Sequence, residues 1–412
     1  MDELDAIFEN FVNSTNSVFK DRDKLRATYI PGSLPHRDRE ILTLARILGP
    51  IMTGALPSNA FLYGKPGSGK TATAKLVLNK LMNKVEEYDI KFKFAYINCN
   101  EVDTDYRTYI SLCTKIGLNV PPTGLPGDEI FRRFKEGIDD QKLFLVIILD
   151  EIDLLLKKSN KALYDLTRIN SELLHAKISI IGITNNVNFK DSISARVRST
   201  LTEQEIVFAP YNANQLQDIL RERTFEGFED NVVEDATIKK VAAMAASEHG
   251  DARRALDLLR VAGEVAENSN ADKVMIYHVD KASSIIEVDT IKEVVLTLPT
   301  HNKIVLLSIL LLSNNLKSGE FISTGDVFDT YVKLCKQIGY QDLTQRRVGD
   351  LINELDVLGM IRANVVSKGR YGRTRVINID SNPHEIFDVL RTDGIVKEIV
   401  NNLGEERFIS YV

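Results

Sequence analysis

The segment GKPGSGKT at residues 64–71 restricts the possible folds of this chain more than any other feature. It fits the pattern G-x-x-x-x-G-K-[ST]. It follows the apolar run NAFLY (59–63) directly and opens a helical stretch, which is the strand–loop–helix context of a phosphate-binding loop. Its glycines let backbone N–H groups surround phosphate oxygens, and the N-terminus of the next helix adds partial positive charge. The loop therefore predicts that the chain binds a nucleoside triphosphate.

Two side chains of this loop are suited to specific tasks. Lys70 can reach the β- and γ-phosphates, and the hydroxyl of Thr71 can ligate Mg²⁺. A glycine-rich turn with an incidental lysine is the alternative interpretation, and the strand–loop–helix context argues against it. The residues expected to bind the nucleotide are Gly64, Lys65, Pro66, Gly67, Ser68, Gly69, Lys70, Thr71 and Ala72.

Polar side chains follow two further apolar runs. LFLVIILDEID (143–153) ends in Asp150 and Glu151, and ISIIGITNN (178–186) ends in Asn185 and Asn186. The carboxyl ends of parallel strands open on one edge of a sheet, so these groups are expected beside the phosphate loop. Asp150 would hold Mg²⁺, Glu151 would orient or polarise the attacking water, and Asn185 would hydrogen-bond water and the γ-phosphate. Taken singly, the two carboxylates could be a polar cap after a buried strand, and Asn185 could be an ordinary turn residue.

Three patterns succeed one another along the chain and predict three domains. Residues 1–205 alternate apolar runs, including KFAYINC (93–99), with long amphipathic stretches, which predicts βαβ units and an α/β base with a parallel sheet. Residues 206–288 are nearly all helical in pattern. Residues 289–412 contain three helical stretches followed by the runs MIRANVV and RTRVINI, joined by the turn SKGRYG. The last pattern predicts a winged helix-turn-helix domain.

Composition limits the classes of partner. The chain has 412 residues, and its 52 basic and 58 acidic side chains give a net charge of −6, so any DNA binding must come from a local patch. The three cysteines (Cys99, Cys113 and Cys335) are too widely spaced for a zinc framework and are expected to be reduced thiols. The N-terminus is acidic and no apolar run reaches the ~20 residues that span a bilayer, which predicts a cytoplasmic protein without a membrane partner.

A basic ribbon near the C-terminus supplies such a patch. Residues 362–375 carry Arg362, Lys368, Arg370, Arg373 and Arg375 with no acidic side chain. The preceding stretch TQRRVGDLINELDVLGM has apolar residues at helical core spacing, which leaves the polar residues of its leading half exposed. A solvated hairpin whose charges prevent edge aggregation is the alternative. The residues expected to contact DNA here are Thr344, Gln345, Arg346, Arg347, Lys368, Arg370, Tyr371 and Arg373.

The strings GKPGSGKT, LDEID, ITNN, SARVRSTL (194–201) and GDARRALDLL (250–259) together resemble the AAA+ ATPases. YIPGSLPHRDREI (29–41), LNVPPTGLPGDEIF (118–131) and TQRRVGDLINELDVLGMI (344–361) resemble, more narrowly, the archaeal origin-recognition and replication-initiator family. The resemblance covers essentially the whole chain in the expected order. It implies an AAA+ parallel-sheet base, an all-helical lid and a C-terminal winged helix.

The resemblance also implies roles at matching positions. Asn185 matches the first sensor asparagine. Arg253 matches the second sensor arginine, which reaches the γ-phosphate from the lid, with the adjoining Arg254 as the alternative. Tyr211 and Arg223 match lid positions that contact the nucleotide.

Two further matches concern the edges of the nucleotide site. The segment around Arg37 matches the stretch that lines the adenine end, and Arg196 matches the arginine finger offered to a neighbouring subunit. Family members commonly have Asp-Pro before that arginine, where this chain has Ser194 and Ala195, so a solvated surface arginine stays an alternative. The expected catalytic residues are thus Glu151, Asn185, Arg253 and Arg196.

In family members a helical insertion in the ATPase domain also grips DNA, and NVPPTGLPGDEIFRRF (119–134) matches it, with Thr123, Arg132 and Arg133 as contacts. The predicted function is a replication initiator that binds double-stranded origin DNA. Slow hydrolysis of ATP to ADP, with Mg²⁺, would act as a switch for recruiting the replicative helicase. Related initiator paralogues are expected partners, at the nucleoid. The alternatives are a DNA-remodelling motor or clamp-loader-like ATPase, and a winged-helix transcription regulator.

Overall fold

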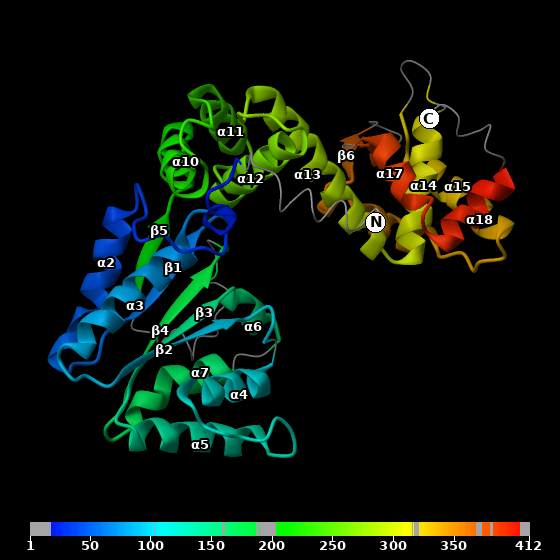
Figure 1. Cartoon of the computed structure of the whole chain (residues 1–412). Helices are drawn as coiled ribbons and strands as arrows, with labels where there is room; N and C mark the ends of the chain where they lie inside the picture. The colour runs from blue at the N-terminus through cyan, green and yellow to red at the C-terminus, as the bar shows by residue number, and fades with distance from the viewer. Residues whose placement is uncertain are drawn as a thin grey trace, which may run out of the picture. The chain divides into compact units, whose positions relative to one another are not determined.

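A computed structural model describes most of the chain, in ranges separated by short gaps: residues 18–102, 104–158, 161–186, 189, 203–314, 316, 321–367, 373–379 and 382–403. They form two compact units, and the boundary between Ala282 and Ser283 falls within helix α13 (Ile276–Thr297). Figure 1 labels their elements.

The first unit is built on a parallel five-stranded sheet in the order β2-β3-β4-β1-β5. Its strands are β1 (Asn59–Gly64), β2 (Phe92–Asn98), β3 (Phe144–Asp150), β4 (Lys177–Thr184) and β5 (Glu203–Phe208). The parallel sheet and four of these strands were predicted. The edge strand β5 was not, because EQEIVF begins with three polar residues and its apolar part, IVF, is only three residues long.

Helices cover both faces of this sheet, as Figure 1 shows. One face packs against α2 (Asp38–Leu48) and α3 (Lys70–Glu86). The other face packs against α4 (Asp105–Ile116), α5 (Gly127–Asp140), α6 (Ile152–Lys158) and α7 (Lys161–Arg168). Because both faces are covered, six of the seven positions of β3 are buried, which explains its continuous apolar sequence. Short 3₁₀ turns are η1 (Arg22–Leu25), η2 (Gly49–Thr53) and η3 (Ile169–Ser171).

The lid of the first unit is helical, as predicted. It contains α10 (Ala213–Gly227), α11 (Asp235–Ser247) and α12 (Ala252–Asn268), into which β5 leads (Figure 1). Asn212 and Gln215 form a capping box at the start of α10. The N-terminal segment is fixed to the end of the same helix, because the backbone N–H groups of Lys20 and Asp21 donate to the carbonyl oxygen of Gly227 at 3.0 and 3.1 Å.

The second unit is a winged helix-turn-helix, as predicted. It contains α14 (Thr300–Asn314), α15 (Thr324–Gln337), α16 (Gln345–Val357), the antiparallel pair β6 (Ile361–Ser367) and β7 (Arg373–Ile379), α17 (Pro383–Leu390) and α18 (Gly394–Leu403). The apolar residues Val348, Leu351, Ile352 and Leu355 of α16 are buried in its core. Helices α17 and α18 were not predicted. Among the described residues, no helix is long and apolar enough to span a membrane.

Replacing Gly182 of β4 with alanine is expected to destabilise the first unit. A Cβ atom there would lie 2.4 Å from Cε1 of the buried ring of Phe61 on β1, so the ring or the strand would have to move. Overpacking of this kind costs about 1–3 kcal/mol of unfolding free energy. Gly49→Ala is the control, because Gly49 has helical backbone angles and nothing lies within 4 Å of its added Cβ. Urea unfolding followed by circular dichroism measures both; equal stability of the two variants would contradict the prediction.

Candidate nucleotide site and nucleic-acid interface

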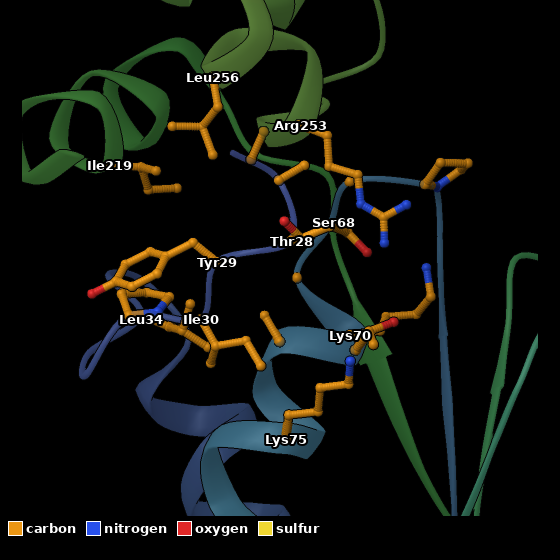
Figure 2. A pocket seen from close by; sticks show the side chains of 18 of the residues that line it. Thr28, Tyr29, Ile30, Leu34, Ser68, Lys70, Lys75, Ile219, Arg253 and Leu256 are labelled. Atoms are coloured by element: carbon orange, nitrogen blue, oxygen red, sulfur yellow. The ribbon is translucent and has the colours of Figure 1, made fainter. Parts of the chain in front are cut away.

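A cavity of about 490 Å³ lies at the phosphate loop and is also lined by the lid and the N-terminal segment (Figure 2). This volume lies in the range of pockets that bind small molecules. The predicted residues that line it are Pro66, Gly67, Ser68, Gly69, Lys70, Thr71, Ala72, Asp150, Glu151, Asn185, Tyr211, Arg223 and Arg253. The structure therefore brings together residues from every described segment in which nucleotide contacts were expected, with Pro35 lining the cavity from the segment around Arg37.

The Lys70 ammonium group is held by uncharged acceptors. Its Nζ atom donates to the carbonyl oxygens of Gly64 and Lys65, both at 2.8 Å, and to Oδ1 of Asn185 at 2.9 Å. Gly64 and Lys65 do not line the cavity; they contribute these carbonyls from the start of the loop. Burial is the main cause that lowers the pKa of Lys70 to about 8; the nearby charge of Asp150 opposes this shift, and that of Arg253 adds to it. An anionic ligand would restore the charged form.

Asp150 accepts three hydrogen bonds. Its Oδ2 atom accepts from the hydroxyls of Thr71 at 2.8 Å and Tyr96 at 3.0 Å, and its Oδ1 atom accepts from the backbone N–H of Glu151 at 3.1 Å. A carboxylate beside a hydroxyl supplies the hard oxygen donors that Mg²⁺ prefers. Within the described part of the chain, no group of three or more His, Cys, Asp and Glu side chains is arranged to hold a metal, so Mg²⁺ here would need ligands from phosphate and water. Tyr96 was missed by sequence reasoning.

The lid contributes Arg253, which was favoured over Arg254. Figure 2 shows its side chain extending from the lid toward the phosphate loop and Lys70. Arg254 is engaged elsewhere, because its Nε atom donates to Oε2 of Glu248 at 3.0 Å. Of the two neighbouring arginines, Arg253 lines the cavity and Arg254 does not.

The first turn of α12 touches the phosphate loop directly. The backbone N–H of Ala252 donates to the carbonyl oxygen of Gly67 at 3.2 Å. A Cβ atom on Gly67, whose φ is +66°, would lie 1.7 Å from Oδ1 of Asp251. Only glycine at this position leaves room for the lid to approach the loop so closely.

Arg37 has a different place from the one predicted. It does not line the cavity and is 3% exposed. Its Nε atom donates to the carbonyl oxygen of Ser68 at 2.9 Å and to the Tyr211 hydroxyl at 3.0 Å, and another guanidinium nitrogen donates to the carbonyl oxygen of Ala209 at 2.6 Å. Three acceptors from the loop and the start of the lid thus hold this guanidinium behind the cavity wall, where it ties these segments together.

Arg223 lines the cavity and also holds the N-terminal segment. Its guanidinium donates to the carbonyl oxygens of Lys24 at 3.1 Å and Tyr29 at 3.4 Å. Sequence reasoning missed the apolar residues at this end of the cavity, which are labelled in Figure 2; the string YIPGSLP was noted only for its family resemblance. The apolar lining residues are Tyr29, Ile30, Leu34, Ile219 and Leu256.

In the winged-helix unit, the polar residues at the start of α16 are exposed, as the helical spacing predicted. The Thr344 hydroxyl accepts from the backbone N–H of Arg347 and caps the helix, while Gln345 and Arg346 face solvent. Arg347 forms ion pairs along its own helix, at 3.8 Å to Asp350 and 3.4 Å to Glu354. Lys368, Arg370 and Tyr371 lie outside the described residues, and Arg373 is described only as the first residue of β7.

One cation of the basic ribbon is engaged within the protein. Arg375 of β7 donates to the carbonyl oxygen of Gly349, inside α16, at 3.2 Å. Ala363 of β6 donates its N–H to Oδ1 of Asp356, near the end of the same helix, at 3.0 Å. These two bonds connect the ribbon to α16.

The insertion of the base places Thr123 in an exposed loop before α5. Arg132 forms ion pairs with Glu129 and Glu136, and Arg133 with Glu129. The two arginines hold the pKa of Glu129 well below its usual range. Their charges are therefore partly balanced on their own helix. Arg196 lies outside the described residues.

Comparison with known proteins identifies the chain. Family models match it in chain order: an AAA domain over residues 56–185, a Cdc6 AAA+ ATPase-type lid domain over 217–284, and a CDC6 C-terminal winged helix domain over 293–389. An ORC1-type DNA replication protein of Thermococcus kodakarensis is 49% identical over 98% of this chain and 99% of its own length. The chain belongs to the ORC1-type DNA replication proteins. ORC1-type DNA replication protein 1 of Archaeoglobus fulgidus is also 49% identical, over 97% of both chains.

A solved structure agrees with this assignment. The chain resembles the Aeropyrum pernix ORC1 protein in complex with DNA with a TM-score of 0.84 and 42% identity, over 93% of this chain and 99% of that one. The resemblance to the initiator family stated from the sequence is thereby confirmed.

The low pKa of Lys70 predicts proton uptake when a nucleotide binds. Phosphate favours the charged amine, whereas the free protein loses this proton above about pH 8. At about pH 8, binding should therefore take up roughly half a proton, and affinity should fall as pH rises further. Isothermal titration calorimetry in buffers of different ionisation enthalpy measures the uptake. At about pH 6.5, where Lys70 is already charged, its contribution should be close to zero; equal values at the two pH values would refute this linkage.

Proposed function

We propose that the cavity binds ATP and ADP with Mg²⁺. Nucleotide binding is the general property of AAA+ ATPase domains, and the chain has both the AAA and the lid models. The phosphates would lie in the loop around Lys70, and the base against the apolar end formed by Tyr29, Ile30 and Leu34. The contact of Lys70 with three uncharged acceptors supports a site prepared for an anion.

We further propose roles for the chain's own groups in slow hydrolysis. Mg²⁺, held by Thr71 and Asp150, would neutralise charge on the phosphate oxygens. Glu151 would accept a proton from the attacking water, and Asn185 would orient that water. Arg253 would stabilise charge on the γ-phosphate from the lid. Because Arg253 and the α12–loop contact lie in one turn of the lid, loss of the γ-phosphate would change the lid's contacts and act as a switch.

We propose that the winged-helix unit binds duplex DNA at replication origins. The observation that supports this most is the match, over 93% of the chain, to an ORC1 protein whose structure contains DNA. The exposed residues Thr344, Gln345 and Arg346 at the start of α16 would enter a groove, with Arg347 beside them. The ribbon residues Lys368, Arg370, Tyr371 and Arg373 would follow the neighbouring backbone. Thr123, Arg132 and Arg133 of the base insertion would add phosphate contacts.

The biological outcome we propose is initiation of replication, with the nucleotide state controlling recruitment of the replicative helicase and contacts with related initiator paralogues. In such an assembly Arg196 would reach the nucleotide of a neighbouring subunit. A map of occupancy across the genome, compared with nascent-strand start points, tests this role. Occupancy at replication starts is expected; occupancy confined to promoters or travelling forks would instead favour a transcription regulator or a remodelling motor.

Lys70→Ala is expected to abolish ATP binding and to leave substantial duplex DNA binding, because the proposed DNA contacts on α16 and the ribbon belong to a different unit. Lys80→Ala is the matched control, since Lys80 is exposed further along α3. Calorimetry measures ATP binding, and fluorescence anisotropy with a labelled duplex measures DNA binding. Loss of both activities in a folded Lys70→Ala protein would refute the proposed separation.

Arg346→Ala is expected to weaken duplex binding and to lower the slope of log affinity against log salt by about one, because one phosphate or base contact is lost. Arg391→Ala is the control: Arg391 is an exposed arginine of the same unit, 4.0 Å from Asp388. Anisotropy titrations over a series of salt concentrations give both slopes. Identical slopes for the two variants would show that Arg346 does not contact the DNA.

A further inference from the structure

A buried phenol holds the residue that precedes the proposed recognition helix. Tyr331 lies on α15 and is fully buried. Its hydroxyl oxygen accepts the backbone N–H of Leu343 at 3.1 Å. The same oxygen lies 2.8 Å from Nδ1 of His301, at the start of α14. One hydroxyl therefore joins the beginnings of two helices.

The protonation states that satisfy all three groups follow from hydrogen-bond rules. The Tyr331 oxygen accepts from Leu343, so its own hydrogen is available for Nδ1 of His301, and the imidazole then carries its proton on Nε2. Burial lowers the pKa of His301, which keeps the ring neutral and able to accept. Burial and, second, the neighbouring thiol of Cys335 raise the pKa of Tyr331, which keeps the phenol protonated.

Leu343 immediately precedes the cap of α16. Thr344 is the N-cap, and the exposed Gln345, Arg346 and Arg347 form the first turn. The N–H bond of Leu343 therefore fixes the point at which this helix begins, one to four residues before every α16 side chain proposed to contact DNA. A shift of that point would displace all of these side chains at once.

The apolar core restrains the start of the helix less directly. Val348, Leu351, Ile352 and Leu355 bury one face of α16 and determine which face is turned inward. Apolar contacts are non-directional and allow small slides along the helix axis. A hydrogen bond to a rigid aromatic side chain loses strength within a few tenths of an ångström, so it restrains that slide.

We propose that Tyr331 and His301 are positioning residues for DNA binding, which set the start of α16 through the hydrogen bond from Leu343. The inference rests on the proposed role of α16 in binding duplex DNA. Neither side chain needs to touch the nucleic acid. Their effect is to align the first turn of α16, so that several weak contacts form at once.

Tyr331→Phe tests this inference in the full-length chain. The probe is a fluorescent duplex that the wild-type chain selects from a random-sequence pool. The variant is expected to bind it about fivefold to tenfold more weakly, because Leu343 N–H and Nδ1 of His301 both lose their partner. The salt slope should fall by about one, since contacts of the displaced first turn are lost. Amide exchange at Leu343 and Gln345 should accelerate.

Variants at His301 give a rescue test. His301→Leu removes the acceptor and should reproduce the weaker binding of Tyr331→Phe. His301→Asn places an amide oxygen near the position of Nδ1 and should restore most of the affinity. If His301→Leu and His301→Asn weaken duplex binding equally, the imidazole acts by packing, which overturns its positioning role.

Ser308→Ala is the matched control for stability. Ser308 is a fully buried residue of α14 whose hydroxyl donates within its own helix, to the carbonyl oxygen of Ile304 at 2.7 Å. It should lower the melting temperature and leave duplex affinity and salt slope unchanged. If Tyr331→Phe also lowers only the melting temperature and leaves duplex affinity and salt slope unchanged, the inference is wrong. If the wild-type chain itself fails to bind any duplex, the proposed DNA function fails instead.

Discussion

The nucleotide site depends on the contact between the phosphate loop and the first turn of α12. Ala252 N–H reaches the carbonyl oxygen of Gly67 at 3.2 Å, and Asp251 occupies the space that any side chain at position 67 would need. Asp251 also caps the helix by accepting the N–H of Arg253 at 2.7 Å. The phosphate loop, the cap of α12 and Arg253 therefore lie close together. Binding or loss of a ligand at the loop would change the surroundings of the lid.

A second constraint is the buried cation of Lys70. Two carbonyl oxygens and one amide oxygen satisfy its three N–H donors, but none of these acceptors carries charge. Burial of this charge is unfavourable and the nearby carboxylates of Asp150 and Asp251 offset it only in part, so the pKa falls. The same arrangement keeps the side chain in place for a phosphate. The loop thus gives up some stability of the free protein in exchange for a site that needs little rearrangement to bind an anion.

The sequence was sufficient to predict features carried by local patterns. The phosphate loop, the carboxylate after β3 and the apolar stripe of α16 each combine a residue type with a spacing that has one common structural explanation. Tyr96 could not be predicted in the same way. Its link to Asp150 depends on β2 and β3 being neighbours, which places Asn98 opposite Asp150, and on the rotamer of one phenol. Arg37 was placed in the right region, but the side to which its guanidinium turns is set by acceptors distant in sequence.

The basic ribbon shows why charge counted along a sequence differs from charge available to a ligand. Arg375 contributed to the count, yet its guanidinium binds the carbonyl oxygen of Gly349. Nothing lies within 4 Å of where a Cβ at Gly349 would be, so this contact uses the backbone carbonyl and does not itself require glycine. Arg347 is likewise paired with acidic residues of α16. Such cations organise the surface proposed to bind DNA, whereas the salt dependence of binding would report only the cations that phosphate neutralises.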